Sequence, residues 1–132
     1  MHSRASRAEC AALSTDEHAH EPFTAPVVSV EPLVRRDVVG HSALHVPEGA
    51  RVVVLAERGT TIEWLDRVLE CRAQYDAESE PGRSSSPLAV PSVEIRIRAL
   101  GPTFHIDLTS RDRAAADEIL RRARLVATAG GG

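Results

Sequence analysis

The chain has 132 residues, of which 42% are hydrophobic and 27% charged, and its net charge is −3. This length allows one domain, and because only four residues are aromatic its core must be aliphatic. No stretch approaches the roughly 20 apolar residues needed to cross a bilayer, and two distant cysteines suggest neither a disulfide framework nor a metal site. These features predict a cytoplasmic protein without a cofactor, a metal or a membrane contact.

The charges are unevenly distributed along the chain. Residues 1–49 hold four arginines and seven acidic residues, whereas residues 50–132 hold twelve of each. A nearly neutral body argues against electrostatic binding of nucleic acid, which normally needs a basic surface. All sixteen basic residues are arginine. Arginine makes good bidentate contacts with anions, but the richness in Ala, Val and Gly favours the codon bias of a GC-rich genome as the explanation.

Residues 1–26 show no sustained periodicity and are predicted to be a disordered tail. The tail contains His18 and His20 among three carboxylates, a combination that can bind zinc or nickel. A structural metal site needs ligands that converge on a fixed frame, which a tail does not provide. We therefore expect no metal site here.

Two β-rich stretches follow, at 27–34 and 38–46. Arg35, Arg36 and Asp37 separate them, so they are predicted to form a hairpin. Pro32 cannot donate a backbone hydrogen bond, which places the first of these strands at a sheet edge. The Pro-Glu-Gly sequence at 47–49 predicts a turn.

Residues 51–56 form an unbroken apolar run, which is typical of a central strand covered on both faces. A helix is predicted next, because Thr60 and Glu63 have the spacing of a capping box. Gly59 lies between this strand and this helix, where many phosphate sites occur. Gly59, Thr60 and Thr61 are therefore a candidate anion site, although no phosphate-binding motif accompanies them.

The predicted helix carries two apolar stripes. Ile62, Leu65, Leu69 and Ala73 recur at helical spacing and are expected to face the sheet. A second stripe consists of Trp64, Val68, Cys71 and Tyr75. One sheet usually covers one side of a helix, so the second stripe either widens the core or forms an interface with a partner.

Residues 76–91 are rich in Ser, Pro and Gly and are predicted to be a flexible loop. Residues 93–108 then alternate in polarity around Gly101-Pro102, which predicts a hairpin. Its register pairs Arg96 with Asp107 and Arg98 with His105. The first pair is a stabilising ion pair, whereas the second has no stability rationale. The polar face with Arg96, Arg98, His105 and Asp107 is therefore a candidate binding surface.

A C-terminal helix is predicted after residue 109. Thr109 and Asp112 have capping-box spacing, with Ser110 as a competing cap. An apolar stripe on this helix includes Ala116, Ile119 and Ala123 and is expected to face the sheet. Residues 128–132 are glycine-rich and are predicted to fray.

These elements predict a single α+β domain over residues 27–127. An antiparallel sheet of about four strands with two helices on one face resembles a ferredoxin-like or ACT-like sandwich. The function that we expect is that of a non-catalytic interaction or regulatory module, acting as a homodimer through its sheet face or the Trp64/Tyr75 stripe. The alternatives are an RNA- or anion-binding module that uses Arg96, Arg98 and His105, and an ACT-type sensor of a small ligand.

Overall fold

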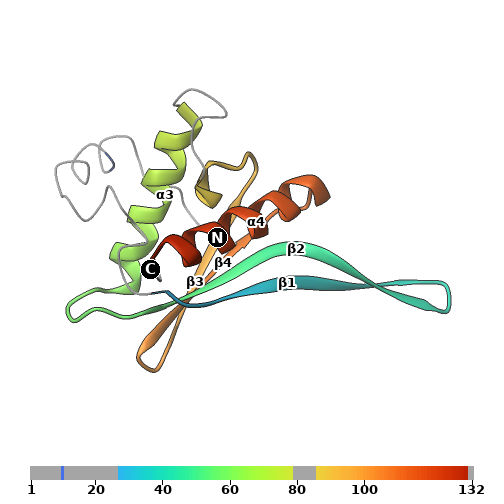
Figure 1. Cartoon of the computed structure of the whole chain (residues 1–132), viewed down its shortest axis with the longest axis horizontal. Coiled ribbons are helices and arrows are strands. Elements are labelled where there is room, and N and C mark those ends of the chain that lie inside the picture. Colours follow the sequence, from blue (N-terminus) through green and yellow to red (C-terminus); the bar gives the residue numbers. More distant parts are fainter. Residues whose placement is uncertain (1–9, 11–26, 79–85, 131–132) are drawn as a thin grey trace.

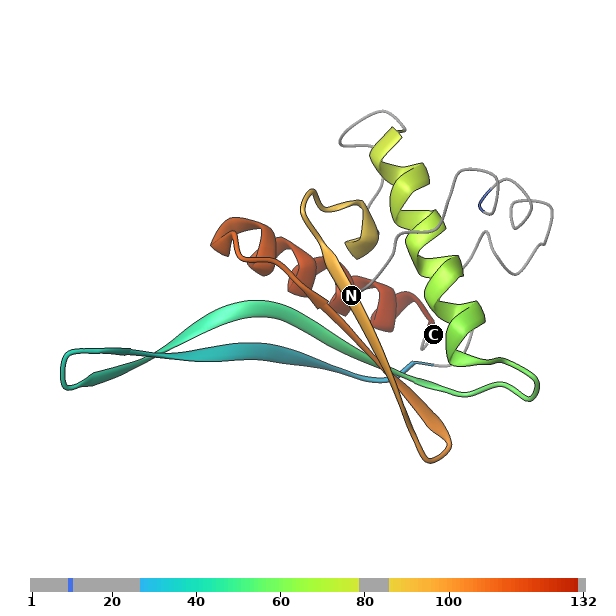
Figure 2. The same cartoon turned by 180° about the vertical axis from the view of Figure 1, so that it is seen from behind.

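The computed structural model describes Cys10 and residues 27–78 and 86–130. It is an α+β fold in which an antiparallel four-stranded sheet, in the order β1-β2-β4-β3, carries two helices (Figure 1). The elements in chain order are β1 (Val27–Val39), β2 (Ser42–Leu55), α3 (Ile62–Glu78), the short 3-10 helix η1 (Pro87–Ala89), β3 (Glu94–Leu100), β4 (Thr103–Thr109) and α4 (Arg113–Gly130). Views from opposite sides place both helices on the same side of the sheet (Figures 1 and 2).

The hairpin of β3 and β4 has the predicted register. Arg96 lies opposite Asp107 and Arg98 lies opposite His105. Gly101 adopts a φ of 59° in the connecting turn, a conformation that glycine reaches without steric cost. β4 also pairs with β2, so it lies between β2 and β3 in the sheet.

The two N-terminal strands are longer than the sequence suggested. β1 continues through Arg35, Arg36 and Asp37, and the chain turns at Gly40, whose φ is 62°. Our prediction of a turn at 47–49 is wrong, because β2 runs through these residues. The register shifts between Leu33 and Val34, since Leu33 pairs with Gly49 and Val34 with Pro47. A β-bulge accommodates the extra residue of β2. Bulges, like turns, often contain glycine.

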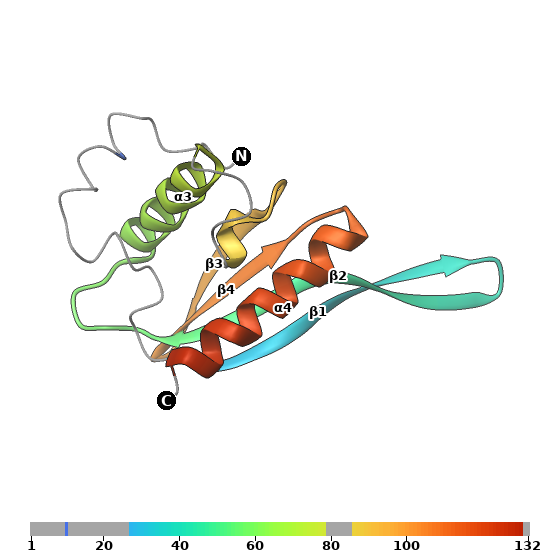
Figure 3. The ribbon, with the colours of Figure 1, turned by 45° about the horizontal axis from the view of Figure 1, so that its top comes forward.

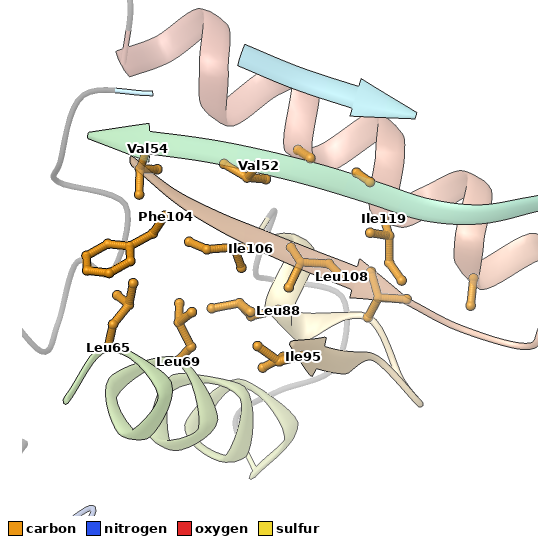
Figure 4. Packing of buried hydrophobic residues seen from close by; sticks show 14 residues of the cluster. Val52, Val54, Leu65, Leu69, Leu88, Ile95, Phe104, Ile106, Leu108 and Ile119 are labelled. Carbon is orange, nitrogen blue, oxygen red and sulfur yellow. The ribbon is translucent and has the colours of Figure 1, made fainter. Parts of the chain in front are cut away.

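The core lies between the helices and one face of the sheet (Figure 4). On that face β2 contributes Val52 and Val54, and β4 contributes Phe104, Ile106 and Leu108; all are buried. Leu65 and Leu69 reach the core from α3, and Ile119 reaches it from α4, as the periodicity of both helices predicted. Because strand side chains alternate, the intervening residues of β2 point to the opposite face.

Part of the predicted flexible loop belongs to the core. η1 contacts both α3 and α4, and Leu88 within it is fully buried in the core (Figure 4). Ser86 caps η1 by accepting a hydrogen bond from the Leu88 amide at 3.1 Å. Arg122 of α4 donates to the Ser86 carbonyl at 3.2 Å. The segment therefore packs where the two helices diverge.

Both helix caps differ from the predicted capping boxes. Thr61, not Thr60, caps α3, because its hydroxyl accepts from the Trp64 amide at 3.1 Å. Asp112 caps α4 by accepting from the Ala115 amide at 3.3 Å. Ser110 accepts from the Asp112 amide, and it shares a 2.9 Å hydrogen bond with the hydroxyl of Ser92.

The two cysteines form a disulfide bond, Cys10–Cys71. Our expectation that they do not pair is wrong, because a separation of 61 residues in the sequence sets no limit on their distance in the folded chain. The bond attaches Cys10 to the middle of α3. The rest of the predicted tail, with His18 and His20, lies outside the described residues.

The hairpin of β1 and β2 extends far beyond the rest of the sheet (Figures 1 and 3). β4 ends at Thr109, which pairs with Gly49, so residues 42–47 of β2 pair with β1 alone among the described strands. We call residues 34–47 the arm. Its exposed apolar side chains are Val34, Val38, Val39 and Leu44.

Gly49 is expected to be the least replaceable glycine of the fold. Its φ is 145°, and a Cβ there would overlap the backbone carbonyl of Leu108. Gly49→Ala should lower the free energy of unfolding by more than about 2 kcal/mol, since backbone strain and the overlap add. Gly59→Ala is the control, because a Cβ at Gly59 meets nothing and only the strain remains. Equal midpoints of the two variants in urea would contradict this account.

The disulfide is expected to contribute about 4 kcal/mol, the loop-closure value for a loop of this length. Cys71→Ser should lose this stability in chemical denaturation, and Cys10→Ser should lose the same amount because it removes the same bond. The double variant should be no less stable than either single variant. Additive losses would show that the cysteines act separately.

Candidate functional site

The open face of the sheet, which points away from both helices, carries a row of four charges. Glu31 of β1 pairs with Arg51 of β2, Arg51 pairs with Asp107 of β4, and Asp107 pairs with Arg96 of β3. Directly paired residues of neighbouring strands share a face. The row therefore crosses the whole sheet with charges that alternate in sign from one strand to the next.

A bidentate ion pair lies at the centre of this row. Arg51 Nε donates to Asp107 Oδ1 at 2.7 Å, and Arg51 Nη2 donates to Oδ2 at 3.1 Å. Both side chains are at least three-quarters buried. The Asp107 carboxylate raises the pKa of Arg51, and the charge of Glu31 adds to this shift.

Asp107 therefore forms its ion pair with Arg51 and not with the predicted partner, Arg96. Arg96 lies opposite Asp107, as the hairpin register required, but the bidentate bond is made with Arg51. The sequence could not identify Arg51, because the hairpin gives the neighbour of β4 on one side only. Arg96 is exposed and has no ion-pair partner among the described residues.

The next row contains the predicted pair of Arg98 and His105. On the side of His105 away from Arg98, its neighbour is Val53 of β2, which is only 6% exposed although neither α3 nor α4 covers this face. His105 is half-buried, and its Nδ1 atom is buried without a hydrogen-bond partner among the described residues. Arg98 is exposed beside it. The structure thus brings all four predicted residues, Arg96, Arg98, His105 and Asp107, onto one surface around Val53.

The end of the open face near the β3–β4 turn is apolar. Leu55 and Leu100 both pair with Thr103, from opposite sides, and both leucines are exposed. The open face therefore consists of a charged row, a mixed row around His105, and an apolar end.

The four residues of the second stripe of α3 have different environments in the structure. Val68 is 1% exposed and Cys71 is bonded to Cys10, so neither is a free surface. Trp64 packs against the core while half-buried. Tyr75 is 62% exposed and lies under the Arg72 guanidinium, 5.2 Å from its ring centre. Of the four predicted interface residues, only Tyr75 lies largely in solvent.

In the candidate anion site, polar groups of Thr60 and Thr61 form hydrogen bonds within the chain. The Thr60 amide donates to the Glu57 carbonyl at 3.0 Å, and the Thr61 hydroxyl caps α3. Gly59 has a φ of 86°, which suits its place in this turn. These polar groups are thus already used for the local fold.

Among the described residues, no group of three or more His, Cys, Asp or Glu side chains is placed to hold a metal ion. No helix in this part of the chain is long and apolar enough to span a membrane.

Comparisons with known proteins give no relative. No protein-family model, no curated protein and no solved structure matches the chain.

We expect the Arg51–Asp107 pair to stabilise the sheet and expect Arg96 to contribute little to its stability. Asp107→Asn should lower the free energy of unfolding by about 1–3 kcal/mol, because it weakens two charge-assisted hydrogen bonds and leaves Arg51 with only the charge of Glu31 in this row. Arg96→Ala should change it by less than about 0.5 kcal/mol, as for other exposed side chains. Urea unfolding of both variants measures the difference. A loss at Arg96 as large as that at Asp107 would restore the pair that the sequence suggested.

Proposed function

We propose that the protein is a non-catalytic interaction module that acts as a homodimer and binds a protein partner through the open face of its sheet. The observation that carries this proposal is the arrangement around Val53. A buried apolar residue and a partly buried ion pair lie at the centre of a face that no described helix covers. Exposed Arg96 and Arg98 lie beside them on β3, at one edge of the sheet. Interfaces commonly combine a well-packed centre with a charged, solvated rim.

The proposal includes no catalytic step. On the described part of the open face, the cross-strand neighbours of His105 are Val53 and Arg98, and neither is a serine or cysteine that could serve as a nucleophile. The predicted alternative through the Trp64/Tyr75 stripe has less support, because Val68 and Cys71 are already covered or bonded within the chain.

We also infer that the fold is a variant of the ferredoxin-like sandwich. β2, α3, β3, β4 and α4 follow one another as the first five elements of that fold do. The edge strand beside β2 is then supplied by β1 from the N-terminal side instead of by a last strand. This likeness supports no particular activity, since such folds host many functions.

The disulfide changes the expectation for the compartment. A cytoplasmic location was predicted partly from the absence of paired cysteines. Disulfides persist mainly in oxidising compartments, so the Cys10–Cys71 bond favours such a compartment for the folded protein.

A second candidate function is binding of RNA or another anion. The exposed guanidinium groups of Arg96 and Arg98, which form no ion pair among the described residues, support it. The nearby carboxylates of Glu31, Glu94 and Asp107 oppose it, and no aromatic side chain lies in these rows for base stacking. For the ACT-type sensor, the structure adds no observation at Gly59.

The open-face proposal is tested by a paired comparison of variants. Arg96→Ala/Arg98→Ala should lose at least nine-tenths of any cross-linked protein partner that the wild type retains, because both rim charges are removed. Arg111→Ala/Arg113→Ala is the control, since it also removes two exposed arginines but at the start of α4. Quantitative mass spectrometry of the cross-linked material gives the ratio.

Two results would count against the proposal. Equal retention by both variants would place partner binding elsewhere on the molecule. Salt-sensitive binding of a single-stranded RNA probe, measured by fluorescence anisotropy and abolished only in Arg96→Ala/Arg98→Ala, would instead support the anion-binding function.

A further inference from the structure

The outer edge of β1 is open along the arm. Among the described strands, β1 pairs only with β2, so its other edge presents unpaired backbone groups. Val34, Val38 and Val39 on this strand are 56%, 70% and 62% exposed. A two-stranded ribbon is marginally stable in water by itself, and an open apolar edge is a template for another strand.

We propose that this edge pairs with the same edge of a second copy, antiparallel over Leu33–Val39 and with Arg36 at the two-fold axis. The inference rests on the homodimer of the proposed function and states where its contact forms. The result would be one continuous eight-stranded sheet in which the two arms lie side by side.

The register follows from symmetry and charge. A two-fold axis perpendicular to a sheet leaves each side chain on its own face, so one residue must lie opposite its own copy. With Arg36 there, Arg35 lies opposite Asp37 of the second copy, and this ion pair occurs twice. Within one chain, Arg35 and Asp37 already bond to each other, with Nε and Oδ1 3.1 Å apart, on the same face of β1. Arg35 is therefore placed to exchange the Asp37 of its own chain for the Asp37 of the second copy.

The apolar residues match in the same register. Val34 lies opposite Val38 of the second copy, and Leu33 lies opposite Val39. The registers on either side lose this agreement. An axis at Asp37 would oppose two like carboxylates and place Arg35 against Val39, whereas an axis at Arg35 would place Asp37 against Leu33. Of these three axes, only the one at Arg36 joins opposite charges and also joins apolar side chains.

Two features that normally block edge pairing do not block this one. Pro32 lacks an amide hydrogen, but in this register it lies opposite Gly40 of the second copy, just outside the paired segment. The like charges of the two Arg36 residues meet at the axis, where both side chains are exposed. This contact between like charges is unfavourable, so its removal should strengthen the dimer.

The geometry also keeps the open face available. Because the arms overlap in opposite directions, the two bodies with their helices lie at opposite ends of the dimer (Figure 2 shows how far the arm extends from the body). A partner could then bind each open face independently.

The contact is tested by cross-linking the full chain with its native disulfide intact. Arg36→Cys should form a covalent dimer under mild oxidation, because residue 36 lies opposite its own copy within disulfide range. His45→Cys is the control: His45 pairs with Arg36 inside the chain and is equally classed as exposed, but it lies one strand further from the axis. Non-reducing electrophoresis should show the dimer only for Arg36→Cys.

Sedimentation of charge variants gives an independent measurement. Asp37→Arg should raise the dissociation constant of the dimer about tenfold, because two attractive pairs become repulsive. Arg36→Ala should lower it about twofold to fivefold, because it removes the repulsion at the axis. Circular dichroism spectra should confirm that both variants are folded.

The outcomes separate this inference from the function on which it rests. A wild-type monomer at all concentrations overturns both the arm contact and the proposed homodimer. A wild-type dimer that is unaffected by Asp37→Arg and not cross-linked through residue 36 overturns the arm contact alone, and places the dimer interface elsewhere.

Discussion

The close approach of Gly49 to the backbone of β4 is the constraint on which the rest of the structure depends. At this point β2 stops being a central strand and becomes half of the arm. On the C-terminal side of Gly49, β2 lies between β1 and β4 and packs against α4, and its side chains supply the centre of the core. On the N-terminal side of Gly49, the bulge shifts the register with β1, and the two strands continue without a third described strand. Only a residue without a side chain allows the two backbones to meet there.

The same strand connects the core with the open face. Val52 and Val54 face the helices, whereas Arg51 and Val53 face away from them. Because Arg51 binds Asp107, the charge at the centre of the open face is neutralised locally, and its exposed charges lie toward the two edges of the sheet. A face organised in this way has a rigid middle and an adaptable rim, which suits recognition of another surface better than enclosure of a small ligand.

Local features of the sequence predicted much of this fold. The β3–β4 register followed from alternation around Gly101, and the core stripes of both helices followed from their periodicity, because each depends on residues close together in the chain. The pairing of β2 with β4, and hence the Arg51–Asp107 bond, depends on residues 56 positions apart, which alternation cannot match. The bulge at Gly49 was mistaken for a turn because both use proline and glycine. The Cys10–Cys71 bond was missed because only the folded chain brings the two residues together.

That bond also gives the chain an unusual covalent topology. Both strands of the arm, the turn at Gly40 and the first part of α3 lie inside a closed ring whose ends are Cys10 and Cys71. Among the described residues of this ring, the tip of the arm is exposed and is a natural point of attack for a protease. A cut there would open the ring but release nothing, since the two pieces would stay joined through sulfur. Cleavage of the arm would thus leave a nicked molecule of nearly unchanged mass, and the damage would be revealed only when the disulfide is reduced.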